Sequence, residues 1–159
     1  MDGWLRFHTL PGSKRYADTP GEAAEVLRRV SAVGDAVLGR EARCQLLLIE
    51  AYGEFHADAY RKVREAFGLI PAWSFDDPED DELVWAVHKT QVGWSGAAFA
   101  PLLSMIADDE IANVLWFSES GSVFAPYDGG IDVFMRPAER AQSVRARFAD
   151  WLSPRPDGL

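Results

Sequence analysis

The sequence contains a single cysteine, Cys44, and only three histidines, His8, His56 and His88. One cysteine cannot form a disulfide within the chain, and its place in the apolar run 44–49 favours a buried small side chain over a reactive thiol. The histidines form no His-x-x-x-His or His-Glu-x-x-His pair, which are spacings typical of zinc sites. We therefore expect no metal site, and the cysteine content fits a reducing, cytoplasmic environment.

Long hydrophobic runs and phosphate-binding glycine loops are also missing. No apolar stretch approaches the ~18 to 20 residues that a membrane-spanning helix needs. Residues 1–6 lack the basic start and the cleavage site of a signal peptide. Neither Gly-x-Gly-x-x-Gly nor Gly-x-x-x-x-Gly-Lys-Ser/Thr occurs. We expect a cytoplasmic protein that binds neither a membrane nor any cofactor.

Basic residues are in the minority, with 16 Lys and Arg against 25 Asp and Glu and a net charge of −9. This charge repels phosphate backbones and attracts cationic partners over long distances. The balance therefore argues against a nucleic acid partner and favours a basic protein partner, although negative charge also serves solubility alone.

The chain has enough apolar material for one dense core. Hydrophobic residues make up 48% of its 159 residues, and six of them are tryptophans. This length suits one domain and is too short for two well-buried ones. No linker or internal repeat divides the chain, so we expect a single domain over residues 1–159.

Residues 19–39 carry the clearest helix signal. Thr19 stands at the N-cap, Pro20 in the first turn and Glu22 at the third position, which is the pattern of a capping box, and Gly39 ends the helix. The predicted apolar stripe contains Leu27, Val30, Val33 or Gly34, and Val37 or Leu38. The predicted solvent face contains Glu25, Arg28 and Arg29.

The other periodicities predict an α+β fold: a mostly antiparallel sheet with about three to four helices packed on it. Residues 44–49 are continuously apolar, which predicts a central strand buried on both faces. Further strands are predicted at 4–10, 71–75 and 83–89, and as a C-terminal meander at 114–117, 123–125 and 131–135. Further helices are predicted at 56–67, around 99–106, and from Pro137 onward.

Three segments of the last ~60 residues have a familiar pattern: 99–109; Val-Phe-Ala-Pro-Tyr-Asp-Gly-Gly-Ile-Asp-Val at 123–133; and Phe-Ala-Asp-Trp-Leu at 148–152. They resemble a family of small bacterial domains of unknown function, marked by Pro-Tyr-Asp, a short glycine turn, Asp-Val and an aromatic Asp-Trp near the C-terminus. Relatives often carry a charged residue in the turn, where this chain has Gly129 and Gly130. The resemblance implies no catalytic residue.

Tyr127, Asp128 and Asp132 surround that turn. Asp-Gly and Gly-Gly pairs are what a tight hairpin with positive φ requires, so turn formation explains most of the segment. Alternatively, the phenol and the two carboxylates project from strand ends and bind a cationic group or a metal ion.

The acidic run 76–82 is the second candidate, with Asp76, Asp77, Asp80 and Asp81 as its binding residues. Its spacing is not that of a calcium loop. It is either a solvated turn or a docking patch for a basic, nuclease-like partner. Trp73 precedes it, and an aromatic binding surface would be lined by Trp73, Phe75, Trp85, Trp94 and Trp116, unless these rings form the core.

Three functions remain open. The first is an acidic protein-binding module, such as a bacterial toxin-immunity or inhibitor protein. The second is a small hydrolase-like enzyme with Asp128 or Asp132 as acid or base and His8 or His88 nearby, which requires two of these groups to meet in a pocket. The third is a scaffold or sensor domain. The charge and the missing catalytic constellation favour the first.

Overall fold

The chain folds into one antiparallel sheet with helices against one of its faces. The computed structural model describes residues 3–52 and 57–155, and within them seven strands form a sheet in the order β1-β7-β6-β5-β2-β4-β3. The strands are β1 (Trp4–His8), β2 (Arg43–Ala51), β3 (Ile70–Asp76), β4 (Val84–Gly93), β5 (Val114–Ser118), β6 (Val123–Tyr127) and β7 (Gly130–Phe134). The helices are α1 (Pro20–Leu38), α2 (Ala57–Phe67), α3 (Ala100–Ala107) and α4 (Arg140–Arg147). The predicted α+β class is confirmed, including the β5-β6-β7 meander followed by a helix.

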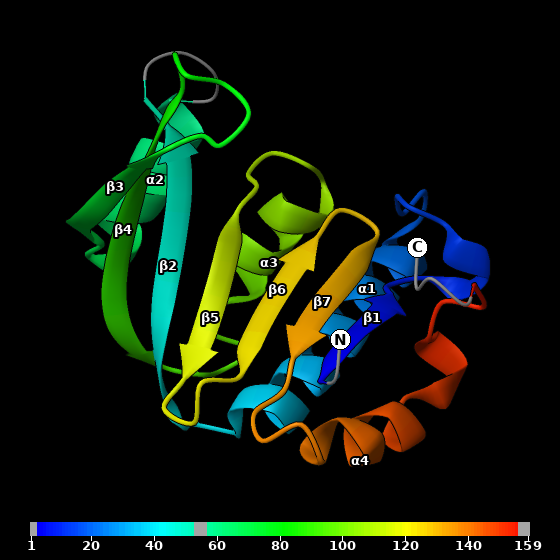
Figure 1. The fold of residues 1–159 in the computed structure, drawn as a ribbon. Coiled ribbons are helices and arrows are strands. Elements are labelled where there is room, and N and C mark those ends of the chain that lie inside the picture. Colours follow the sequence, from blue (N-terminus) through cyan, green and yellow to red (C-terminus); the bar gives the residue numbers. More distant parts are fainter. Residues whose placement is uncertain (1–2, 53–56, 156–159) are drawn as a thin grey trace.

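The helices lie on one side of the sheet (Figure 1). Helix α1 packs against α3, β5 and β6, α2 contacts β2, and α4 contacts α1 and the edge strand β1. In the described part of the chain no helix covers the opposite side, which we call the open face.

Helix α1 begins and ends as predicted. The Thr19 hydroxyl accepts a hydrogen bond from the amide of Glu22 at 3.1 Å, and Pro20 lies in the first turn. Gly39 ends the helix with a φ of 92°, a value that favours glycine. The Glu22 carboxylate in turn accepts from the amide of Asp18, the residue before the N-cap, at 2.7 Å.

Arg29 is not on the solvent face, which corrects the prediction. Only 7% of its surface is exposed. It donates to the Glu25 carboxylate at 2.6 Å and to the His8 carbonyl at 3.2 Å, and its guanidinium lies over the Trp151 ring. Arg29 lies one helical turn from the buried Val33, and its charge is compensated where it enters the interior. It therefore connects α1 to β1 and to the C-terminal segment.

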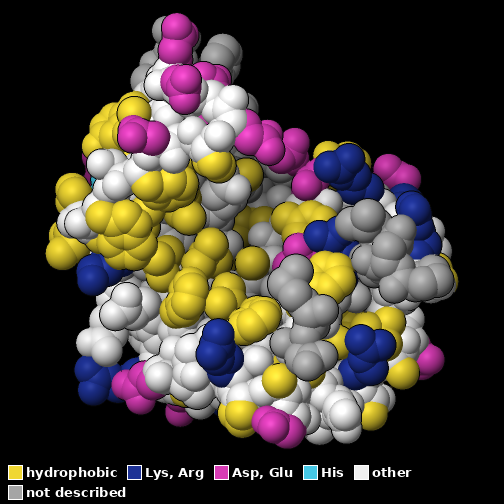
Figure 2. All heavy atoms as spheres, viewed as in Figure 1, with side chains coloured by type: hydrophobic (Ala, Val, Ile, Leu, Met, Phe, Trp, Pro, Cys, Tyr) yellow, Lys and Arg dark blue, Asp and Glu magenta, His cyan; other side chains and the backbone are white. Residues whose placement is uncertain are grey.

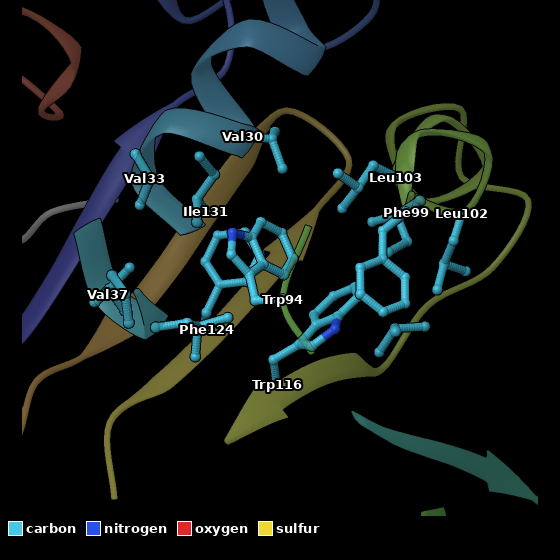
Figure 3. Close-up of a cluster of buried hydrophobic side chains, with 14 of the residues drawn as sticks. Val30, Val33, Val37, Trp94, Phe99, Leu102, Leu103, Trp116, Phe124 and Ile131 are labelled. Atoms are coloured by element: carbon cyan, nitrogen blue, oxygen red, sulfur yellow. The ribbon is translucent and has the colours of Figure 1, made fainter. Parts of the chain in front are cut away.

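Two buried indoles occupy the centre of the core (Figure 3). Trp94 and Trp116 are completely buried and meet edge to face, with 5.5 Å between ring centroids. Phe99 stacks on Trp94 at 5.8 Å, and Phe124 meets the same ring at 5.1 Å. The Trp94 indole also donates to the Asp35 carboxylate at 2.8 Å. Both tryptophans are therefore core residues and do not belong to a binding surface.

Strand β2 is central, between β5 and β4, as predicted. Burial on both faces is only partly correct. Leu46 and Leu48 face the helices and are buried, but on the other face Gln45 is exposed and Ile49 is half-buried. Leu47 is buried there without a helix above it, because neighbouring side chains shelter it.

The remaining elements agree with the predictions to within a few residues. Tyr60 and Val63 of α2 are buried, and Pro101 lies in the first turn of α3. Helix α4 begins later than Pro137, because residues 137–139 form a turn before it. His56 lies outside the described residues.

Candidate functional site

The open face carries an apolar patch over β3, β4, β2 and β5. Cross-strand neighbours of an antiparallel sheet project to the same face, and the register joins Trp73 to Val87 and Val87 to Ile49. It also joins Leu47 to Leu115. Figure 2 shows hydrophobic side chains gathered over these four strands. The apolar patch comprises Leu47, Ile49, Ile70, Trp73, Phe75, Trp85, Val87, Leu115 and Phe117.

The apolar patch contains most of the large apolar side chains that are exposed. Six such residues are exposed in the described part of the chain, and four of them belong to the patch: Ile70, Trp73, Phe75 and Phe117, at 60%, 52%, 42% and 38% exposure. Isolated exposed apolar residues are ordinary, but a contiguous group of this kind marks a binding surface.

A hollow of about 490 Å³ opens in the patch between Trp73 and Phe117. Leu47 lines it together with the side chains of Gln45 and Gln91. Its size is within the range of ligand pockets. Aromatic walls with two amide groups beside them fit an apolar anchor side chain whose neighbouring polar groups form hydrogen bonds.

The acidic run forms the turn between β3 and β4, directly beside the patch (Figure 2). Asp77 organises this turn, because its carboxylate accepts from the Trp85 indole at 2.7 Å and from the amides of Glu79 and Asp80 at 2.8 and 3.1 Å. The bond from Trp85, followed by those from the amides, holds the pKa of Asp77 below its usual value. Asp77 therefore orders the turn, and its role in binding stays a prediction.

The described residues do not neutralise the charge of this turn. Residues 76–82 hold six carboxylates, and none of them forms an ion pair within the described residues. Carboxylates elsewhere do, for example Glu25 with Arg28 and Arg29, and Glu50 with Arg64. Uncompensated negative charge thus adjoins an exposed apolar surface.

Asp128 and Asp132 lie near the opposite edge of the sheet from β3, so they are far from Trp73 and the acidic run. Asp128 is in the β6–β7 turn, and Asp132 is on β7. Asp128 accepts from the Arg15 guanidinium at 2.6 Å and from the Tyr16 hydroxyl at 2.7 Å. Burial raises the pKa of Asp128, but these two hydrogen bonds outweigh burial and leave it below its usual value. Asp128 thus binds a cationic group, and that group belongs to its own chain.

Asp132 is also occupied by an arginine of the same chain. Arg6 on β1 donates two hydrogen bonds to the two oxygens of Asp132, both at 2.7 Å. The guanidinium lies over the rings of Trp4 and Tyr127, with 5.3 and 5.4 Å to their centroids. Burial, with a contribution from Asp132, raises the pKa of the Tyr127 phenol. Asp132 and the Tyr127 ring thus both contact Arg6, a cationic group of the same chain.

Neither His8 nor His88 forms a hydrogen bond with these carboxylates. His8 pairs with Gly130 across β1 and β7, and its Nε2 has no hydrogen-bond partner among the described residues. Burial, together with Arg6 and Arg29, lowers the pKa of His8. His88 lies on β4, on the far side of β2, β5 and β6 from the β7 carboxylate. The convergence that the enzyme hypothesis requires is not present in the described residues.

Replacing Asp128 with Asn should destabilise the domain in a pH-dependent manner. Because the folded-state pKa of Asp128 is lowered, its contribution exists above the unfolded pKa of about 4 and disappears as the pH falls through the folded value. We expect Asp128→Asn to lower the free energy of unfolding by about 1 kcal/mol at pH 7. Urea unfolding at pH 7 and pH 3 measures the difference, which should shrink at pH 3. Glu41→Gln is the control, because Glu41 is exposed and forms no ion pair with any described residue. A difference that is equal at both pH values would contradict this role.

Other classes of site find no support in the described residues. There, no group of three or more His, Cys, Asp or Glu side chains is placed to hold a metal ion. None of the helices there is both long and apolar enough to span a membrane. Burial raises the pKa of the Cys44 thiol to about 11, so this side chain is not an activated nucleophile.

The sequence predicted Trp73 and the acidic run, but it missed Ile70, Leu47 and Phe117. The available signal was the continuous apolar character of residues 44–49 and 114–117. In a sheet with helices on one side, such strands place half of their apolar side chains on the uncovered face.

One of three comparisons with known proteins found a match, and it covers almost the whole chain. A family model described as a domain of unknown function, DUF3885, matches residues 1–156. No curated protein and no solved structure matches significantly. The resemblance seen in the last third of the sequence is confirmed in this coarse form, as membership of a family without an assigned function. The chain belongs to the DUF3885 family of domains.

Proposed function

We propose that this domain is a protein-binding module whose open face binds a folded partner with an apolar surface surrounded by basic residues. The observation that carries the proposal is the apolar patch, in which Ile70, Trp73, Phe75 and Phe117 stay exposed on the face that none of the described helices covers. Truncation of central aromatic residues typically costs an interface about 2 kcal/mol or more, so such residues act as anchors. A bacterial toxin-immunity or inhibitor protein is the class of module that we propose.

The charge beside the patch favours a basic partner over a second copy of this chain. The six carboxylates of residues 76–82, which form no ion pair with the residues that the structure describes, would steer a cationic surface toward the patch and speed association. A second copy would bring its own net charge of −9 to the interface, so the two copies would repel each other. The buried, unreactive Cys44 suits a module that acts in the cytoplasm.

Photo-crosslinking in the native cell tests the proposal. A photoreactive phenylalanine analogue at Phe117 probes the patch, and the same analogue at Lys62, exposed on α2 behind the sheet, is the matched control. We expect a crosslinked basic protein from position 117 and not from position 62. The double substitution Trp73→Ser and Phe75→Ser should weaken its binding about thirtyfold, which corresponds to the loss of about 2 kcal/mol.

Other outcomes would overturn the proposal. Equal yields from positions 117 and 62 would mean that the crosslinks are unspecific. A product made of two copies of this chain would make the open face a dimer interface. The absence of any product from position 117 would leave the patch without a partner.

A further inference from the structure

The two edges of the sheet differ. At one edge, Leu152 of the C-terminal segment forms an antiparallel bridge with Phe7 of β1, and α4 packs beside the same strand. At the other edge, β3 has β4 as its neighbour, and nothing in the described residues pairs with its outer side (Figure 1). An uncovered edge strand presents backbone amides and carbonyls to any strand that approaches.

The hydrogen-bonding pattern identifies which backbone groups of β3 point outward. The Tyr52 amide donates to the Val84 carbonyl at 3.0 Å, so Val84 directs its backbone groups toward β2. Because the direction alternates along an antiparallel strand, Trp85 and Val87 direct theirs toward Phe75 and Trp73 of β3. Ser74 lies between these two pairs and Asp76 follows the second. The N–H and C=O groups of Ser74 and Asp76 therefore point away from the sheet.

The outward stretch is short and flanked by features that stop strand pairing. Pro71 has no N–H, and a bulge interrupts the ladder between Pro71 and Trp73. The acidic turn follows Asp76. Natural proteins use prolines, bulges and charges to protect an edge. Here these features lie at the two ends, and the segment 73–76 between them is open and carries the exposed rings of Trp73 and Phe75.

We propose that the partner adds an extended segment to β3 as an eighth strand, in the mode of β-strand addition. The inference rests on the proposed function and specifies how the partner engages. Apolar residues of the segment pack against Trp73 and Phe75. Its Lys or Arg residues lie along the carboxylates of residues 76–82, which have no ion-pair partner in the described part of the chain. Charge complementarity selects a basic segment over the β3 strand of a second copy.

Proline at position 74 tests the inference. Ser74→Pro removes an amide that points outward and leaves the pairs of Trp73 and Phe75 with β4 intact. We expect the photo-crosslink from Phe117 to fall at least tenfold in Ser74→Pro and to be unchanged in Ser74→Ala, which keeps the amide. Phe117 lies on β5, with β2 and β4 between it and β3, so the proline does not contact the probe.

A second variant covers the case in which Ser74→Pro fails to fold, as judged by circular dichroism. Asp76→Pro removes the other outward amide, and Asp76→Asn controls for the lost charge. An undiminished crosslink in a folded proline variant would overturn the added strand and leave face binding intact. A crosslinked product of two copies of this chain that the proline abolishes would overturn the choice of partner. The absence of a crosslink in every variant would count against the proposed function itself.

Discussion

Replacing Trp94 with Ala should lower the free energy of unfolding by about 4 kcal/mol, because a large buried side chain is lost and a cavity remains. The indole is completely buried, contacts Phe99, Trp116 and Phe124, and donates a hydrogen bond to Asp35. A loss of this size in a domain of this length lowers the melting temperature by about 10 °C or more. Thermal and urea unfolding, followed by circular dichroism, measure the change.

Trp73→Ala is the matched control, because it deletes the same side chain from the open face. Trp73 is 52% exposed, so its truncation should cost less than about 1 kcal/mol of stability. The two variants thus separate a tryptophan that stabilises the fold from one that is available for binding. Similar losses of stability in both variants would show that the two indoles are not divided between core and surface.

Replacing Gly34 with Ala should destabilise the domain by about 2 to 3 kcal/mol through overpacking. A Cβ at this position would lie 2.7 Å from Cε2 and 2.8 Å from Cη2 of Trp94, and closer still to Cζ2. The indole has no room to retreat, because Trp116 and Phe124 pack against it. Equilibrium unfolding of the variant measures the loss.

The clash can be tested by removing the part of the ring that causes it. Trp94→Phe lacks the outer carbons of the indole and should cost about 2 kcal/mol by itself. In the double variant the new methyl group of Gly34→Ala occupies the vacated space. The double variant should therefore lose at least about 1 kcal/mol less stability than the sum of the losses of the two single variants. Strict additivity would show that Gly34 is needed for a reason other than its contact with Trp94.

Local sequence pattern was sufficient to predict most of the elements. The N-cap at Thr19, the stop at Gly39 and the turns between the meander strands are short-range signals, and the structure has all of them. Arg29 was misplaced because helical spacing put it beside both the apolar stripe and the charged face. Its burial depends on Trp151 and on the His8 carbonyl, which are distant in sequence.

The candidate site was harder to predict, for a related reason. The partners of Asp128 and Asp132 are Arg15 and Arg6, which lie 113 and 126 residues away along the chain. No local spacing reveals that these carboxylates are already occupied. Likewise, the apolar strands indicated burial, but periodicity does not distinguish a face covered by the chain's own helices from one left open to another molecule.

In the described sheet, strand β2 lies between the β3–β4 hairpin and the other four strands. Its Leu46 is opposite Thr90 on one side and Trp116 on the other, so closing the sheet brings together segments that lie far apart along the chain. Such topology raises the contact order, and proteins rich in non-local pairings fold in roughly milliseconds to seconds. Until β2 pairs with its neighbours, β4 and β5 each expose an unpaired strand edge. The folding chain is therefore prone to aggregation before β2 is in place.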